Sequence, residues 1–176
     1  MHQLLLLRHA KSSWDDSSLP DRQRPLNARG RRSAAVMRRA MAERGLLPDI
    51  VLVSTARRTQ ETLDALEPFE EAPLIDRLDA LYLASAEQML AILREVPDTA
   101  RSVLVIGHNP GMHDLALLLS AHPPSAAAKN DARHLASGFP TAALAEFAVA
   151  GPWSRLGRGG AQLVRFLTPR ALEGDG

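Results

Sequence analysis

The sequence predicts an α/β fold in which a single doubly wound, mostly parallel sheet is flanked by helices. Three short runs of Leu, Ile and Val, at residues 4–7, 50–53 and 103–106, are typical of strands buried on both faces. Helical patterns over residues 28–44, 56–66 and 85–96 separate these runs. This alternation of strand and helix favours parallel strands joined by crossover helices.

The ends of the predicted helices carry recognisable signals. Asn27 is suited to cap the first helix, and Gly45 is suited to end it. Residues 85–88 read Ser-Ala-Glu-Gln, which is a capping box, and Pro97 follows that helix. We therefore expect well-defined boundaries for these two helices.

The C-terminal part contributes two more predicted strands, at residues 143–149 and 163–167. Residues 121–140 are rich in small and polar residues and in proline, so we expect an irregular surface excursion there. We find no repeat and no convincing linker, so residues 1–176 are expected to form one domain.

Composition limits the expected partners and the compartment. The 176 residues carry a net charge of +1 and only 4% aromatic residues, so we do not expect the protein to bind nucleic acid. There are no cysteines, which excludes thiolate metal sites and a thiol nucleophile. Since no apolar run is long enough to span a bilayer, we expect no membrane association and a cytoplasmic location.

Polar side chains follow three of the predicted strands at the point where each strand ends. Arg8 and His9 follow the first, residues 54–57 (Ser-Thr-Ala-Arg) the second, and His108 and Asn109 a third. Ligands of doubly wound folds bind outside the carboxyl ends of the strands. These strand ends are therefore expected to meet in one pocket.

Two arginines and two histidines in one pocket are costly to bring together unless they bind an anion, and phosphate is the natural ligand. We expect Arg8, Arg57 and His108 to donate to phosphoryl oxygens. His9 is the candidate nucleophile, because nearby cations oppose protonation of its ring. Lys11, Ser12 and Asn109 are the candidate substrate contacts. No zinc-type spacing is present, so no metal and no cofactor is expected.

Four blocks in order resemble the histidine phosphatase superfamily, and most closely its SixA-type phosphohistidine phosphatase branch. They are RHAK at residues 8–11, DRQRPLNARG at 21–30, STARRTQET at 54–62 and GHNPG at 107–111. The resemblance implies a phosphoglycerate mutase-like fold and a metal-independent phosphatase in which His9 is phosphorylated in turnover. It also implies that Arg8, Arg57 and His108 hold the phosphoryl oxygens, with Arg57 as the motif arginine. Ala10 stands where the superfamily usually has glycine.

Relatives that act on alkyl phosphates commonly use a carboxylic acid to protonate the leaving group. Asp79 is the candidate here, with Asp76 as the second choice. Neither residue is strongly marked by its surroundings in the sequence. A phosphohistidine nitrogen leaves as a nearly neutral imidazole and demands less of an acid than an alkoxide does. A weakly marked acid therefore favours a phosphoramidate substrate.

The favoured function is hydrolysis of protein phosphohistidine through a covalent phosphohistidine intermediate. The alternative is a small-molecule phosphomonoesterase of the same fold, with a phosphorylated metabolite in place of a phosphorylated protein. A non-catalytic module that only binds phosphate is a weaker alternative, since binding alone needs no nucleophile such as His9.

Overall fold

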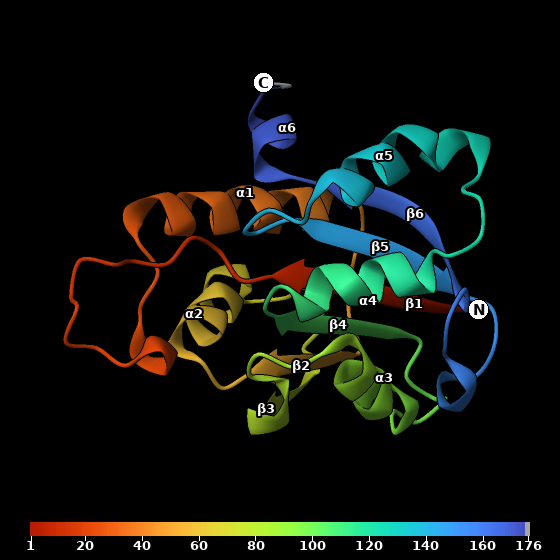
Figure 1. The fold of residues 1–176 in the computed structure, drawn as a ribbon, viewed down its shortest axis with the longest axis horizontal. Helices are drawn as coiled ribbons and strands as arrows, with labels where there is room; N and C mark the ends of the chain where they lie inside the picture. Colours follow the sequence, from red (N-terminus) through yellow and green to blue (C-terminus); the bar gives the residue numbers. More distant parts are fainter. Residues whose placement is uncertain (175–176) are drawn as a thin grey trace.

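A computed structural model describes residues 1–174, and all six of its strands form one sheet (Figure 1). The strands are β1 (His2–Arg8), β2 (Ile50–Ser54), β3 (Leu74–Leu78), β4 (Ser102–Gly107), β5 (Leu144–Val149) and β6 (Ala161–Leu167), in the order β3-β2-β4-β1-β5-β6. The first four are mutually parallel, whereas β5 runs antiparallel to both β1 and β6. The predicted doubly wound, mostly parallel α/β fold is confirmed.

The helices cover both faces of the sheet. One face packs against α1 (Ala28–Glu43) and α2 (Arg57–Leu66), and α6 (Pro169–Gly174) lies against α1. The other face packs against α3 (Ala86–Arg94), α4 (Gly111–Leu119) and α5 (Lys129–Ser137). Among residues 1–174, none of the helices combines the length and the apolar character that a membrane crossing requires.

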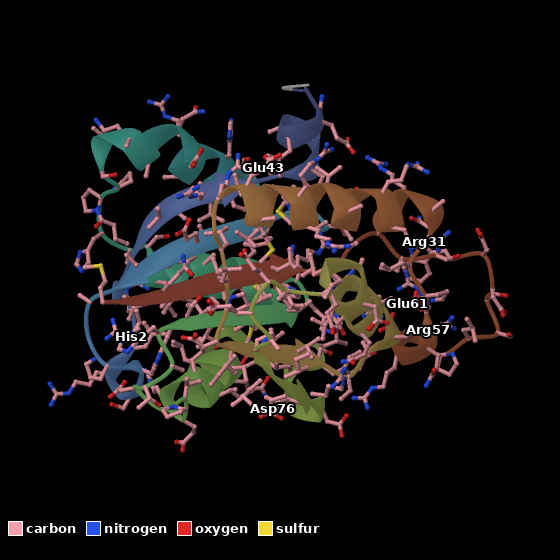
Figure 2. All side chains as sticks on the ribbon, turned by 180° about the vertical axis from the view of Figure 1, so that it is seen from behind. His2, Arg31, Glu43, Arg57, Glu61 and Asp76 are labelled. Atoms are coloured by element: carbon pink, nitrogen blue, oxygen red, sulfur yellow. The ribbon has the colours of Figure 1, made fainter. Side chains whose placement is uncertain are left out.

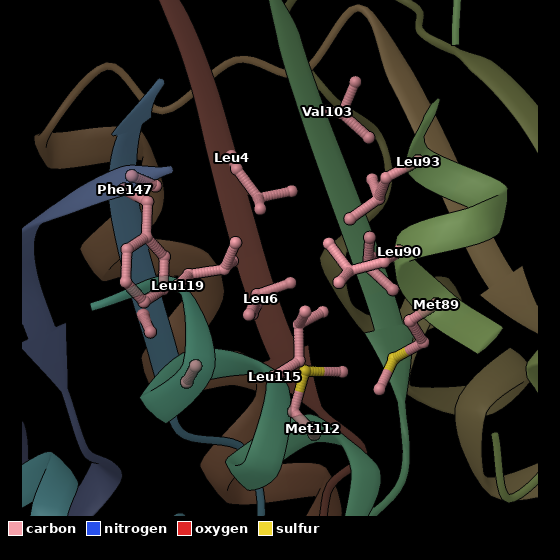
Figure 3. Packing of buried hydrophobic residues seen from close by; sticks show 14 of the residues in the cluster. Leu4, Leu6, Met89, Leu90, Leu93, Val103, Met112, Leu115, Leu119 and Phe147 are labelled. Atoms are coloured by element: carbon pink, nitrogen blue, oxygen red, sulfur yellow. The ribbon is translucent and has the colours of Figure 1, made fainter. Parts of the chain in front are cut away.

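The four consecutive leucines of β1 serve both layers of the core. Leu4 and Leu6 pack with α3 and α4, as Figure 3 shows, while Leu5 and Leu7 pack with α1 and α2. Successive side chains of a strand point to opposite faces, so a strand covered on both faces needs an apolar residue at every position. β1 is therefore fixed in the centre of the sheet, and its last residue, Arg8, reaches the sheet edge.

The predicted helix caps are present. The side chain of Asn27 accepts a hydrogen bond of 2.8 Å from the backbone N–H of Gly30 at the start of α1. Ser85 and Gln88 form both hydrogen bonds of the capping box at the start of α3. A Cβ at Gly30 would lie 2.1 Å from the carbonyl oxygen of Lys11, so α1 approaches that loop as closely as glycine allows.

Two expectations about the fold were wrong or incomplete. Residues 121–140 are not irregular throughout, because they contain α5. Only Leu135 of α5 is buried, so its sequence carries little apolar periodicity. The sequence also did not indicate β3, an edge strand whose side chains are mostly exposed and which pairs with β2 alone.

Candidate active site

A pocket of about 280 Å³ opens where β1, β2 and β4 end. Because these strands are parallel and adjacent, their carboxyl ends lie at one edge of the sheet. Six of the eight predicted site residues line this pocket, namely Arg8, His9, Lys11, Ser12, His108 and Asn109. Arg57 and Asp79 do not.

His9 is buried, with 7% of its surface exposed, and its ring has a defined tautomer. Its Nδ1 lies 2.7 Å from the carbonyl oxygen of Ala10. A carbonyl only accepts, so Nδ1 carries the proton and Nε2 keeps a free lone pair. Burial lowers the pKa of His9 to about 4, and the charges of Arg58, Arg8 and Arg24 act in the same direction. His9 is therefore a neutral imidazole at pH 7.

His108 lies beside His9, with 5.3 Å between the ring centroids. Its Nε2 is 2.7 Å from Oγ of Ser54, and that hydroxyl accepts from the backbone N–H of Ala56 at 3.3 Å. Because a hydroxyl can donate and accept at the same time, Ser54 fixes the orientation of the His108 ring in either tautomer. Burial, followed by the charges of His9 and Arg58, lowers the pKa of His108 to about 3. His108 is thus a neutral imidazole at pH 7, and its Nδ1 has no hydrogen-bond partner among residues 1–174.

Arg8 and Asn109 are held by one carbonyl group. The oxygen of Phe139 accepts from Nη1 of Arg8 at 3.1 Å and from Nδ2 of Asn109 at 2.9 Å. Nε of Arg8 is buried and has no hydrogen-bond partner among residues 1–174, so it remains available as a donor. Nδ2 of Asn109 uses one of its two N–H groups for this bond and keeps the second as a donor, while its Oδ1 has no hydrogen-bond partner among residues 1–174.

The structure corrects the choice between the two adjacent arginines, because Arg58 lines the pocket and Arg57 does not. Both lie in the first turn of α2, where consecutive residues point in directions about 100° apart. Arg57 donates to Glu61 at 2.8 Å on the exposed side of the helix (Figure 2). Arg58, only 4% exposed, faces inward. The phosphoryl-binding arginine of this segment is expected to be Arg58.

Asp21 organises the cationic side of the pocket. Its Oδ2 accepts from Nη2 of Arg58 and its Oδ1 from Nη1 of Arg24, each at 3.0 Å, and its backbone oxygen accepts from Nη1 of Arg58 at 2.8 Å. The hydroxyl of Tyr82 also donates to Oδ2. The Tyr82 hydrogen bond, together with the two arginines, lowers the pKa of Asp21 to about 2. Asp21 is therefore ionised at neutral pH and holds no proton to give.

The predicted acid lies outside the pocket. The side chain of Asp79 is 78% exposed, accepts from Thr55 Oγ1 and pairs with Nη1 of Arg22 at 3.4 Å. Asp76, the second choice, lies in the middle of β3, where it is paired with Leu52 (Figure 2). Among residues 1–174, Asp21 is the only carboxylate that lines the pocket.

Ser12 lines the pocket and also supports a neighbouring arginine. Its Oγ accepts a 2.6 Å hydrogen bond from Nη2 of Arg24, whose Nε donates to the backbone oxygen of Ser13 at 3.0 Å. Ser12 therefore positions a buried arginine that the sequence analysis did not assign to the site. Asp21 and Arg24 both belong to the sequence block at residues 21–30 that resembles the superfamily. That block is the sequence feature that could have assigned them to the site. Lys11 lines the pocket as an exposed cation.

The pocket is arranged to bind an oxyanion. Four cations, Arg8, Lys11, Arg24 and Arg58, line it against the single carboxylate of Asp21. Guanidinium forks match the geometry of phosphoryl oxygens, and a neutral histidine lone pair beside them can attack phosphorus. In residues 1–174, no group of three or more His, Asp or Glu side chains is placed to hold a metal ion.

Comparisons with known proteins agree with this chemistry. Residues 4–92 match the model of the histidine phosphatase superfamily, branch 1. The chain is 34% identical to an uncharacterized protein of Mycobacterium tuberculosis over 93% of this chain and 100% of that protein. It is also 37% identical to an uncharacterized chloroplastic protein of Arabidopsis thaliana, over 67% of this chain and 59% of that longer relative.

Similarity of structure extends over nearly the whole chain. A solved structure from Nakamurella multipartitia, described as a candidate phosphohistidine phosphatase SixA, superposes with a TM-score of 0.81 and 30% identity. The match covers 96% of each chain. At this coverage the structural similarity extends beyond residue 92, where the match to the family model ends. The chain therefore belongs to the histidine phosphatase superfamily, in its SixA-type branch.

Proposed function

We propose that this phosphatase hydrolyses protein phosphohistidine through a phosphohistidine intermediate on His9. Nε2 of His9 attacks phosphorus while the bond from phosphorus to the substrate nitrogen breaks, and the leaving imidazole takes a proton from solvent. Water then attacks the phosphoryl group, the bond from Nε2 to phosphorus breaks, and phosphate is released with a proton. The observation that carries the proposal is the free Nε2 lone pair of a neutral His9 among fixed cations.

The choice of a phosphoramidate over an ester rests on the acids available in the pocket. The lining carboxylate, Asp21, is kept ionised by Tyr82 and two arginines, and Asp79 lies outside. An alkoxide leaves slowly unless a positioned acid protonates it, whereas a phosphohistidine ring that takes a proton from solvent leaves as a neutral imidazole and demands less of a positioned acid. The similarity to the Nakamurella structure supports the same substrate class.

The intermediate can be trapped directly. We expect the protein, mixed with a histidine-phosphorylated peptide carrying radioactive phosphate and quenched in alkali within one turnover, to retain label on His9 alone. Alkali preserves phosphohistidine and destroys phosphoserine, so peptide mapping identifies the residue. His9→Ala should retain no label and show no turnover. Turnover that persists in His9→Ala would contradict the mechanism.

Two aspartates provide a matched test of the acid argument. Asp21→Asn is expected to lower kcat/KM for phosphoramidate about 10- to 100-fold, because Arg24 and Arg58 lose the carboxylate that orients them. Asp79→Asn should leave kcat/KM within about twofold, because this side chain is exposed and outside the pocket. Steady-state assays with phosphoramidate and with an alkyl phosphate measure both. A large loss in Asp79→Asn confined to the alkyl phosphate, with fast turnover of that ester by the unmodified protein, would favour the small-molecule esterase instead.

A further inference from the structure

Two large apolar side chains stand exposed at the edge of the candidate active site. Trp14 is 73% exposed and Leu83 is 54% exposed, and both line the pocket. The rest of the lining is mostly charged or polar. Because both side chains border the pocket, a ligand that occupies the pocket can cover them. We call Trp14 and Leu83 the apolar rim.

Trp14 is held in place although it is exposed. The guanidinium carbon of Arg24 lies 3.2 Å from the centroid of the Trp14 ring, which is a stacked cation–π contact. Arg24 is itself fixed by Ser12, by the carbonyl of Ser13 and by Asp21. One face of the ring therefore rests on a rigid support, and a partner that covers the other face does so at little entropic cost.

Leu83 is held in a backbone conformation that leucine rarely adopts. Its φ of 52° lies in the left-handed region, which is unfavourable for a side chain with a Cβ. Both neighbours are anchored, since Tyr82 donates to Asp21 and the carbonyl of Ala84 packs against Gly111, where a Cβ would lie 1.8 Å from its oxygen. Strained residues held by their surroundings concentrate at ligand-binding sites.

We propose that the apolar rim binds the residues that flank phosphohistidine in a polypeptide substrate, and so selects polypeptides with apolar flanking residues over small phosphorylated molecules. This rests on the function proposed above. The cations inside the pocket are placed to bind the phosphoryl group, so the apolar rim is left for the rest of the substrate. A small anionic metabolite has no apolar surface that could cover Trp14 and Leu83. A peptide does, and ordered tryptophans of this kind commonly dominate protein recognition.

Three substrates test this proposal: phosphoramidate and two short peptides with one phosphohistidine each, flanked by leucines in one and by serines in the other. We expect the unmodified protein to show a kcat/KM about tenfold higher for the leucine-flanked peptide than for the serine-flanked peptide. In the double variant Trp14→Ala/Leu83→Asn this ratio should fall to about one, because the apolar contacts are lost. The peptide ratio is the readout, because any effect of the double variant on Arg24, which stacks on Trp14, would change the turnover of both peptides alike, and phosphoramidate measures that common effect.

Two controls separate specificity from folding. Asparagine tolerates the left-handed region, so Leu83→Asn alone should melt at or above the temperature of the unmodified protein. Leu74→Ser removes an exposed leucine at the start of β3, outside the pocket lining, and should leave the peptide ratio unchanged. A double variant that keeps the preference for the leucine-flanked peptide would overturn the role of the rim. No turnover of any substrate by the unmodified protein would instead overturn the proposed function.

Discussion

Arg58→Ala is expected to lower kcat/KM for phosphoramidate about 100- to 1000-fold, whereas Arg57→Ala should change it less than about twofold. Arg58 is buried in the pocket wall, and both ends of its guanidinium are fixed by Asp21. A preplaced donor of this kind stabilises the charge that spreads over phosphoryl oxygens in the transition state. Arg57 forms an exposed i,i+4 ion pair with Glu61 and does not line the pocket. Exposed pairs of this kind contribute little to stability.

The two variants differ by one position in the same helix turn, so each controls for the other. Circular dichroism and a melting curve establish that both fold, and Arg58→Lys, which keeps the charge but loses the fork, should show an intermediate loss. Equal losses in Arg57→Ala and Arg58→Ala would contradict the assignment of Arg58, as would full activity in Arg58→Ala.

Acidification from pH 7 to pH 4 is expected to lower the free energy of unfolding by a few kcal/mol through His9 and His108. The folded-state pKa values, about 4 and about 3, lie below the ordinary value of 6.5. Between these pKa values both histidines are protonated in the unfolded chain and neutral in the folded protein. The free energy of unfolding therefore rises with pH across this window. The full contribution is present above about pH 6.5 and is lost as pH falls toward 3.

Urea unfolding at several pH values between 7 and 4 measures this loss. The double variant His9→Gln/His108→Gln lacks both titrating rings, so its free energy of unfolding should depend less steeply on pH over the same range. Protonation of Asp21 lowers the free energy of unfolding further only at more acidic pH, because the pKa of Asp21 in the folded protein is about 2. If the unmodified protein and the double variant showed the same slope between pH 6.5 and 4, the two histidines would not be buried in their neutral form.

Several features were readable from local sequence because their causes are local. An unbroken leucine run predicts a doubly covered strand, and the run at β1 occupies the centre of the sheet. The helix caps at Asn27 and Ser85 each pair residues that are three positions apart, so the local sequence is enough to predict them. Parallel strands with polar ends also implied a shared pocket, which is why Arg8, His9 and His108 were found together in it.

The sequence by itself determined five of the six strands, the caps of α1 and α3 and the meeting of three strand ends, since each follows from spacing along the chain. Only the tertiary structure decided that Arg58 faces the pocket, that Asp79 does not, and that Asp21 joins two arginines to Tyr82. The physical reason is that these depend on the direction in which each side chain points. That direction is fixed by packing between segments far apart in sequence, which no local pattern records.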